Sequence, residues 1–185
     1  LGPGTTGTLT LGGNVTYDAV NNPAAAIISG GTLVLGATRT FSIGDSINTS
    51  AELTIYSPIT DFAPIKTGAG TLMLAGANTY AGATIINGGR LQLGATGSLP
   101  ATTNIVVNGT TPGGSAVFDV GGQAQAIGTL TFGGTGATST SMNSVAIAPG
   151  GTLTLGGNVS YLATNDPLGA NISTGTLALG GATRT

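Results

Sequence analysis

The sequence predicts an all-β chain folded as a parallel β-helix (β-solenoid) with turns of about 20 residues. Three observations predict this fold: a short strand motif that recurs along the chain, a long internal repeat, and a composition rich in glycine and poor in charge. Strands that recur in this way bury their apolar faces by stacking on their neighbours. We therefore expect residues 1–185 to form one continuous solenoid segment.

The composition indicates a β-structured core. Of the 185 residues 34 are glycine, and 5% are charged, whereas a typical domain carries about 25% charged residues. The chain is 40% hydrophobic, which argues against disorder, because disordered chains are poor in aliphatic residues. The glycines do not recur at every third position, as collagen requires. No apolar run reaches the roughly 18 residues of a membrane helix, so we expect no membrane-spanning segment.

The charges exclude one class of partner. The basic residues are four in number and scattered along the chain: Arg39, Lys66, Arg90 and Arg184. A protein that binds nucleic acid neutralises many phosphates with clustered Lys and Arg. We therefore expect no nucleic acid partner.

A long repeat divides the chain. Residues 8–36 and 152–180 are identical at 20 of 29 positions without a gap, at an offset of 144. The tetrapeptide Ala-Thr-Arg-Thr then recurs at 37–40 and 182–185, after one extra glycine. About 1–145 is therefore one long repeat, and about 146–185 is the start of the next copy. We expect the parent protein to continue beyond Thr185 with a variant of the sequence that follows residue 40.

A shorter motif lies within the long repeat. Gly-Thr-Leu-x-Leu (or Phe) begins at Gly7, Gly31, Gly70, Gly128, Gly151 and Gly175, and degenerate versions begin at Ala51, Gly89 and Ala116. Most steps between successive starts are about 19–26 residues, near the turn length of β-helical repeats. The short step from 116 to 128 indicates two strands within one turn. Side chains alternate in each motif, which places Leu72 and Leu74 on one face.

Second strands are expected between these motifs, at 14–17, 26–29, 84–87, 104–108 and 145–148. Gly-Gly, Asn-Gly and Asn-Asn-Pro mark the corners. The same signals also allow antiparallel hairpins in a β-sandwich. A sandwich, however, does not normally repeat one strand motif at near-constant spacing, and no segment holds apolar residues at helical spacing.

The central segment resembles a known repeat. Residues 66–80 read KTGAGTLMLAGANTY, and residues 81–94 continue AGATIINGGRLQLG. Almost throughout, this stretch is similar to the autotransporter-associated β-strand repeat. The resemblance implies a passenger region of a large bacterial protein, located outside the cell or at its surface. It also implies that the β-helix is right-handed.

No catalytic site is expected. The chain has no histidine, so Ser-His-Asp and Cys-His chemistry lack their base. The six acids are spread thinly along the chain: Asp18, Asp45, Glu52, Asp61, Asp119 and Asp166. A glycosidase needs two carboxylates about 5–10 Å apart. Asp45 and Glu52 can meet across a turn and Asp119 lies in a strand, but we interpret the acids as solvated loop or edge groups and the protein as not an enzyme.

Neither a metal site nor a cofactor site is expected. Gly44-Asp45-Ser46 and Asn165-Asp166-Pro167 are isolated oxygen donors, whereas calcium takes six to eight. The Gly-Gly pairs precede strands rather than helices, so they do not form phosphate cradles.

Two residue types leave a binding role open. Asparagines at the corners are expected to bond nearby backbone or to stack on their equivalents in the next turn, with glycan recognition as the alternative. They are Asn14, Asn78, Asn87, Asn108 and Asn158. Four tyrosines are expected to pack between turns, with a sugar-stacking strip as the alternative: Tyr17, Tyr56, Tyr80 and Tyr161.

These observations lead to a structural function. An open solenoid exposes strand edges that accept further strands, and flanks with so few charges do little to keep copies apart. The first hypothesis is a stalk, fibre or sheath element at the bacterial cell surface that associates with adjacent repeats or copies of itself into filaments. The second is an adhesin shaft that binds host or matrix glycans or other surface proteins. The third is a polysaccharide-acting enzyme that uses Asp45 or Asp119.

Overall fold

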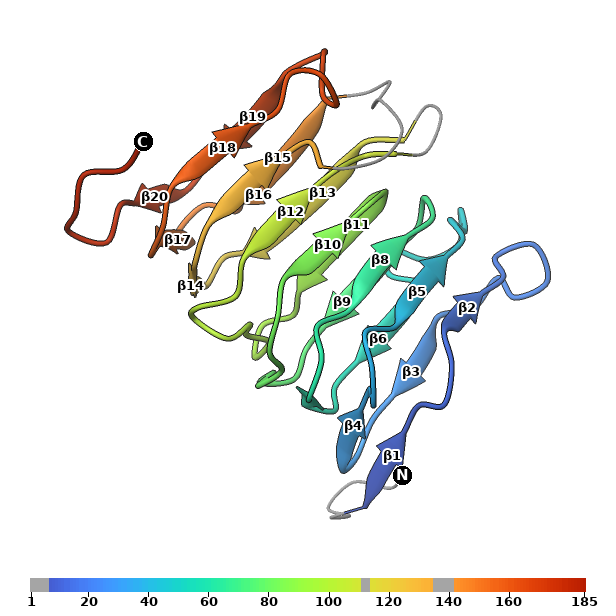
Figure 1. The fold of residues 1–185 in the computed structure, drawn as a ribbon. Coiled ribbons are helices and arrows are strands. Elements are labelled where there is room, and N and C mark those ends of the chain that lie inside the picture. Colours follow the sequence, from blue (N-terminus) through green and yellow to red (C-terminus); the bar gives the residue numbers. More distant parts are fainter. Residues whose placement is uncertain (1–6, 111–113, 135–141) are drawn as a thin grey trace.

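The computed structural model describes residues 7–110, 114–134 and 142–185. These residues form twenty short β-strands and no helix, wound into a parallel solenoid of about six turns (Figure 1). The first and last turns lie at opposite ends of the stack (Figure 1). The predicted fold class is therefore confirmed.

Two sides of the solenoid are seven-stranded parallel sheets. The first long sheet contains, in spatial order, β2 (Val15–Tyr17), β5 (Thr40–Ile43), β8 (Ile65–Thr67), β10 (Thr84–Ile86), β12 (Ile105–Val107), β15 (Leu130–Phe132) and β18 (Val159–Tyr161). The second long sheet contains β3 (Ala26–Ile28), β6 (Leu53–Ile55), β9 (Thr71–Leu74), β11 (Gly89–Leu93), β13 (Ala116–Gly121), β16 (Asn143–Ile147) and β19 (Ala170–Ser173).

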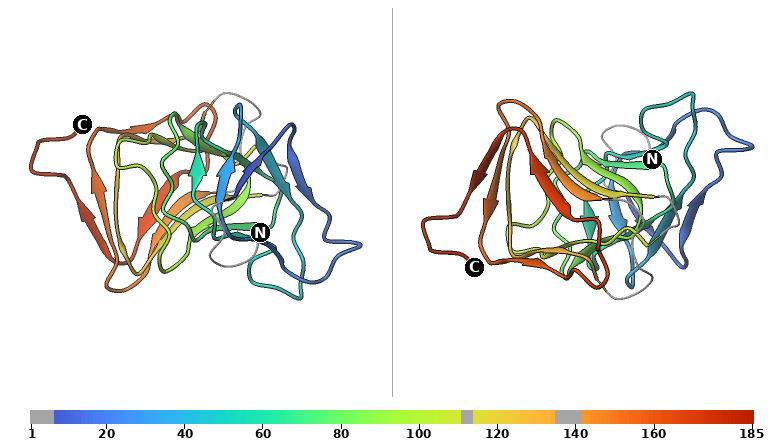
Figure 2. Two further views of the ribbon diagram at one scale, coloured as in Figure 1. Left: turned by 90° about the horizontal axis from the view of Figure 1, so that it is seen from below. Right: turned by 90° about the horizontal axis from the view of Figure 1, so that it is seen from above.

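The third side is less regular. One three-stranded sheet contains β1 (Thr8–Thr10), β4 (Thr32–Val34) and β7 (Ile59–Thr60), and another contains β14 (Ala124–Ile127), β17 (Thr152–Leu155) and β20 (Thr176–Ala178). Between these two sheets the described chain makes the isolated bridges Phe62–Ala81 and Ala77–Ser98. Figure 2 shows the turns looping round a common interior.

Turn length varies along the stack. In the central turns Leu53 pairs with Leu72, and Leu72 pairs with Leu91. The predicted length of about 20 residues describes these turns. Near the C-terminal end Leu130 pairs with Val159, which is a longer step along the chain. The described loop after β18, residues 162–169, is mostly exposed.

The recurring motif does not mark one side of the solenoid. Its copies form β4 and β17 on the third side, β9 on the second long sheet and β15 on the first. Every side needs a glycine corner and two inward apolar residues, so one motif serves all three. The short step from 116 to 128 runs from β13 to β15, with β14 between them. It covers less than one full turn, as predicted.

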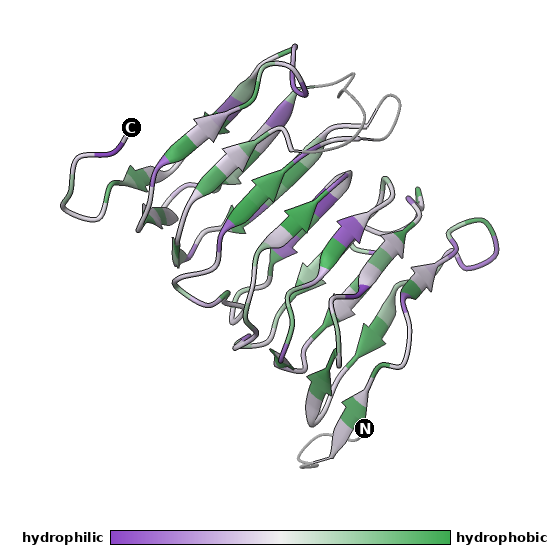
Figure 3. Cartoon of the chain, in the orientation of Figure 1, coloured by the Kyte–Doolittle hydropathy of each residue, from purple (hydrophilic) through white to green (hydrophobic). Residues whose placement is uncertain are grey.

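The core is a column of inward side chains. Leu72 and Leu74 are fully buried, while Thr71 and Met73, which alternate with them, are partly exposed. Phe41, Phe118 and Ile55 are also fully buried. Burying each such side chain contributes about 1.5–3 kcal/mol. Figure 3 shows hydrophobic residues on the strands and many of the hydrophilic ones at the corners.

The two copies of the long repeat occupy matching positions. β2 and its copy β18 both lie in the first long sheet, and β3 and its copy β19 both lie in the second. Six pairing steps separate the members of each pair. The offset between the two copies therefore corresponds to six whole turns of the solenoid.

Candidate functional site

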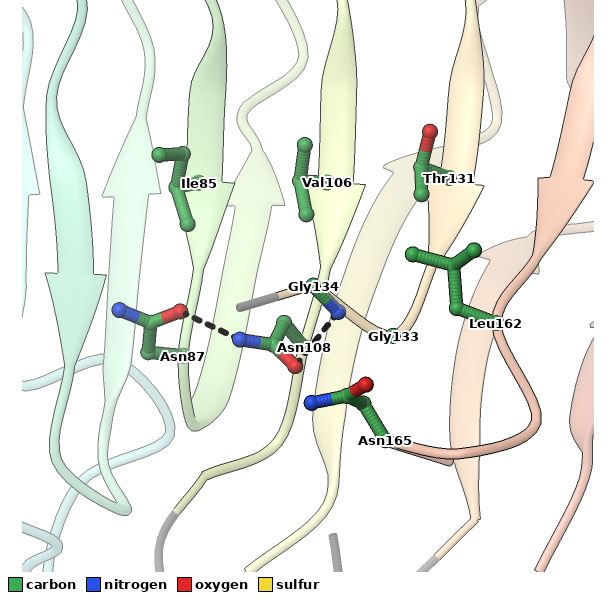
Figure 4. A pocket seen from close by; sticks show the side chains of 9 residues that line it. All are labelled: Ile85, Asn87, Val106, Asn108, Thr131, Gly133, Gly134, Leu162 and Asn165. Atoms are coloured by element: carbon green, nitrogen blue, oxygen red, sulfur yellow. Dashed lines mark hydrogen bonds between the residues drawn. The ribbon is translucent and has the colours of Figure 1, made fainter. Parts of the chain in front are cut away.

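A shallow groove of about 640 Å³ runs across the outer face of the first long sheet (Figure 4). Its floor is formed by Ile85 of β10, Val106 of β12 and Thr131 of β15. These side chains point outward because their neighbours along each strand, such as Ile105 and Val107, are buried in the core. Three adjacent turns thus contribute one residue each to the floor.

Asparagines line one edge of this groove. The Nδ2 of Asn108 donates to the Oδ1 of Asn87 one turn earlier, at 3.3 Å. The Oδ1 of Asn108 accepts the backbone N–H of Gly134 at 2.8 Å (Figure 4). Leu162 and Asn165, from the loop after β18, close the far end. The expected stacking of asparagines between turns is therefore present here.

The groove offers amide groups beside an apolar floor. None of its lining residues is charged: they are Ile85, Asn87, Val106, Asn108, Thr131, Gly133, Gly134, Leu162 and Asn165. Such a surface suits a neutral extended ligand with hydroxyl groups rather than an ion. Asn87 and Asn108 were predicted as corner residues from the sequence, whereas the floor and Leu162 were not. Only the stacking of turns brings those residues together.

The other asparagines singled out bond backbone groups. The Oδ1 of Asn14 accepts the N–H of Thr40 at 3.0 Å, and that of Asn158 accepts the N–H of Thr185 at 3.4 Å. Asn78 is buried, and its Oδ1 accepts the N–H of Ile59 at 2.9 Å. These three residues join successive turns at their corners.

The tyrosines do not form a strip. Tyr80 is 2% exposed, and its hydroxyl lies 2.6 Å from the Oγ1 of Thr84. Burial raises the pKa of Tyr80 well above its ordinary value. Tyr17 is also buried, whereas Tyr56 and Tyr161 are exposed on different turns. A sugar-stacking row of these residues is therefore not formed.

Lys66 is an unexpected polar group in the core. It is fully buried, and its Nζ donates to the backbone carbonyls of Thr67 and Gly68, each at 2.8 Å, and of Gly88 at 3.1 Å. Burial lowers the pKa of Lys66 to about 7. The negative charges of Glu52 and Asp45 oppose this shift, because they stabilise the charged amine. Lys66 thus ties the corner of its own turn to the corner of the next.

The carboxylates bond mainly to backbone and to other side chains. Glu52 is buried and accepts the N–H groups of Ser46 at 3.1 Å and of Thr71 at 2.6 Å. Asp119 forms an ion pair with Arg90 at 2.5 Å and accepts the N–H of Gly121 at 2.9 Å.

Two of the remaining acids lie in loops. The exposed Asp18 accepts a hydrogen bond from the side chain of Asn21, which lowers the pKa of Asp18. Asp45 is exposed. Its negative charge nevertheless acts to raise the pKa of Lys66. Asp45 is thus solvated, as expected, but Glu52, Asp119 and Asp166 are buried, so the expectation of solvated acids is wrong for these three.

No group of three or more metal-ligating residues occurs among the described residues. Asp166 is fully buried, and its two carboxylate oxygens have no hydrogen-bond partner. Its backbone carbonyl accepts a hydrogen bond from the Tyr161 hydroxyl.

Within 7–110, 114–134 and 142–185 there is no helix with the length and hydrophobicity to span a bilayer.

The model of one known protein family matches the central turns. Residues 65–93 match the family model of the passenger-associated-transport-repeat. They form β8, β9, β10 and β11, and the match confirms the resemblance drawn from residues 66–94. It supports a repeat segment of a large bacterial surface protein, which implies a secreted or surface location. Neither the curated proteins nor the solved structures contained a match to the chain.

Proposed function

We propose that this chain is a structural segment of a stalk, fibre or sheath, with a mechanical rather than a catalytic role. The observation that carries the proposal is the continuity of the stack. Each long sheet runs through seven parallel strands, from the first turn to the copy of that turn. Because each turn contacts only its neighbours, adding turns lengthens the rod without changing its cross-section.

The surface also supports self-association into filaments. Charged residues are 5% of the chain, so little repulsion keeps neighbouring rods apart. The exposed corner loops carry apolar side chains, including Ile47 at 99%, Val20 at 91% and Leu168 at 55% exposure. These residues suit lateral contacts between rods.

Electron microscopy of the full-length protein, isolated from the cell surface, tests this function. We expect rods or filaments, and an antibody against residues 7–185 should label intact cells along them. Protease treatment of intact cells should remove the label. Dispersed globular monomers, or label reached only after cell lysis, would contradict the proposal.

A second candidate function is an adhesin shaft that binds glycans, and the groove on the first long sheet favours it. Asn87 presents an amide beside the apolar floor, and amides with apolar surface suit sugar recognition. On a glycan array we expect selective binding that Asn87→Ala abolishes. Asn14→Ala is the matched control, because Asn14 also bonds the next turn but lies outside the groove. Binding that survives Asn87→Ala would exclude the groove.

A further inference from the structure

We propose that the peptide bond between Asp166 and Pro167, in the loop after β18, is a self-cleavage site. The side-chain carboxyl of Asp166 attacks the backbone carbonyl carbon of its own residue and releases Pro167 as a new N-terminus. The proposal goes beyond the structural function, because it assigns a covalent reaction to one loop and holds whether or not the rods associate into filaments.

No donor holds the carboxyl of Asp166 away from the backbone. Asp166 is fully buried, whereas the other residues of the loop 162–169 are exposed or half-buried. Neither carboxylate oxygen has a hydrogen-bond partner among the residues that the structure describes. A buried polar group without a partner costs free energy. Such groups are uncommon in native folds, and a role in a reaction is one explanation for them.

Packing of the loop against the preceding turn places Asp166. A Cβ at Gly133 would lie 3.3 Å from the Cβ of Asp166 and 2.8 Å from Leu162 O, so a side chain at Gly133 would displace the loop. The backbone N–H groups of Asn165 and Asp166 both donate to Leu162 O, at 3.0 and 3.1 Å. The carboxyl therefore belongs to a tight, internally bonded turn that is covered from one side.

Two donors polarise the carbonyl of the bond that breaks. The backbone carbonyl oxygen of Asp166 accepts a hydrogen bond from the Tyr161 hydroxyl and one from the N–H of Gly169 at 3.3 Å. Donors in this position stabilise the negative charge that develops on the oxygen when the carbonyl carbon is attacked. Pro167 is exposed, so water reaches the same bond. The loop thus combines a nucleophile, a polarised carbonyl and access for water.

The reaction balances and needs only water. An oxygen of the protonated Asp166 carboxyl bonds to the backbone carbonyl carbon and closes a cyclic anhydride. The carboxyl proton passes to the nitrogen of Pro167, and the C–N bond breaks to release a secondary amine. Water then opens the anhydride and leaves Asp166 as a C-terminal residue. Attack within one residue avoids the entropic cost of bringing two reactants together.

The first copy of the repeat provides an internal comparison. Asn22-Pro23 stands at the equivalent place, and the Tyr17 hydroxyl bonds the backbone carbonyl of Asn22. Asn22 is exposed and carries no carboxyl. The two loops share the tyrosine and the proline but differ in the acid and in its burial, so the reaction is assigned to the second copy alone.

Mass spectrometry of the purified chain in mildly acidic buffer tests the proposal. β19 and β20 pair with β16 and β17, so the fragment 167–185 can stay bound after cleavage, and the masses are measured in denaturant. We expect fragments 1–166 and 167–185 to form at least about tenfold faster in the native chain than in the same chain held in urea. The rate constant should not change with protein concentration. Cleavage that is as fast in urea, or that speeds up with concentration, would overturn the inference.

Two substitutions of the acid provide the matched comparison. Asp166→Asn should abolish cleavage, and it should still fold because the equivalent loop carries Asn22. Asn22→Asp creates the same dipeptide in the exposed loop, where cleavage should be at least about tenfold slower than after Asp166. Thermal unfolding of each variant checks its fold. Equal rates in the two loops would show that the dipeptide alone reacts, and would overturn the site.

Tyr161→Phe tests the polarised carbonyl. It keeps the nucleophile and removes one donor, so cleavage should slow by about tenfold. Tyr17→Phe, in the equivalent loop of the first copy, is the control and should leave the rate unchanged. An unchanged rate in Tyr161→Phe would overturn the part assigned to the donors. These measurements use purified chains, so their failure is distinct from a failure to find rods on cells.

Discussion

The central turns differ from the outer turns in length and in the contents of their corners. The central step from β9 to β11, which pairs Leu72 with Leu91, is shorter than the outer step from β15 to β18, which pairs Leu130 with Val159. The central turns contain buried polar groups in or beside their corners, namely Lys66 of β8, Asn78 and the hydroxyl of Tyr80. The outer corners carry exposed loops with apolar residues such as Val20 and Leu168.

This difference shows two ways to satisfy backbone groups at a corner. A long loop exposes its carbonyl and N–H groups to water. A short corner buries them, so each needs an internal partner. Lys66 supplies three such hydrogen bonds, and Asn78 bonds Ile59, Gly76 and Ser98. The short turns therefore depend on a few residues, whereas the long ones tolerate substitution.

The largest expected effect is at a central glycine. Gly89 has a φ of +63°, and a Cβ there would lie 2.4 Å from Gly70 O. Gly89→Ala should lower the free energy of unfolding by about 3–5 kcal/mol, because backbone of the preceding turn cannot move aside. Urea unfolding followed by circular dichroism measures the loss.

Gly150→Ala is the matched control in an outer turn. Gly150 also has a positive φ, +85°, but nothing lies within 4 Å of its Cβ position. Only backbone strain remains, which costs about 1–2 kcal/mol. Equal losses at the two glycines would show that close stacking does not distinguish the central turns.

The next effect concerns two cations that bond backbone carbonyls between turns. Lys66→Met removes three hydrogen bonds to partly or fully buried carbonyls and should cost about 2–3 kcal/mol. Arg39 donates to Leu35 O and Leu11 O in a partly exposed outer corner. Arg39→Met should cost about 1 kcal/mol, since water can replace the guanidinium. The reverse order in urea unfolding would contradict the comparison.

The regular part of the molecule is predictable from the sequence. Alternation placed Leu72 and Leu74 inside, and turn signals placed Asn14 and Asn78 at corners. Both inferences depend on local chemistry, which the sequence displays directly. β14 was not predicted, because Ala124–Ile127 lacks the glycine motif; its pairing with β17 stabilises it as a strand.

The buried lysine and the groove escaped prediction for a different reason. Lysine is normally exposed, and one of the three acceptors of Lys66 is Gly88, on the next turn. Likewise the groove joins Ile85 to Leu162, which are brought together only by stacking of turns. Contacts between turns depend on register, and a motif that serves all three sides does not specify register.

Titration of Lys66 makes the stability of the central turns depend on pH. Its pKa is about 7 in the folded chain and returns to the ordinary 10.5 on unfolding. Between these values the unfolded chain binds more protons, so stability should rise with pH from 7 to 9.5, by at most about 1.4 kcal/mol per unit. Above pH 10 the raised pKa of Tyr80 opposes this gain, because only the unfolded tyrosine ionises.

Lys66→Met should abolish that rise, and Arg39→Met should retain it. Urea midpoints at pH 7, 8 and 9 measure the slope for the three chains. A slope that persists without Lys66 would assign the titration to another group.

The smallest effect is expected in the corner loop after β2. Val20 is 91% exposed, so its side chain contributes little packing to the fold. Val20→Ser should change the free energy of unfolding by less than about 0.5 kcal/mol. In the central turns, Ile86→Ser removes a fully buried side chain and should cost several times more. A loss from Val20→Ser above about 1 kcal/mol in urea unfolding would show that the outer loops pack more tightly than their exposure indicates.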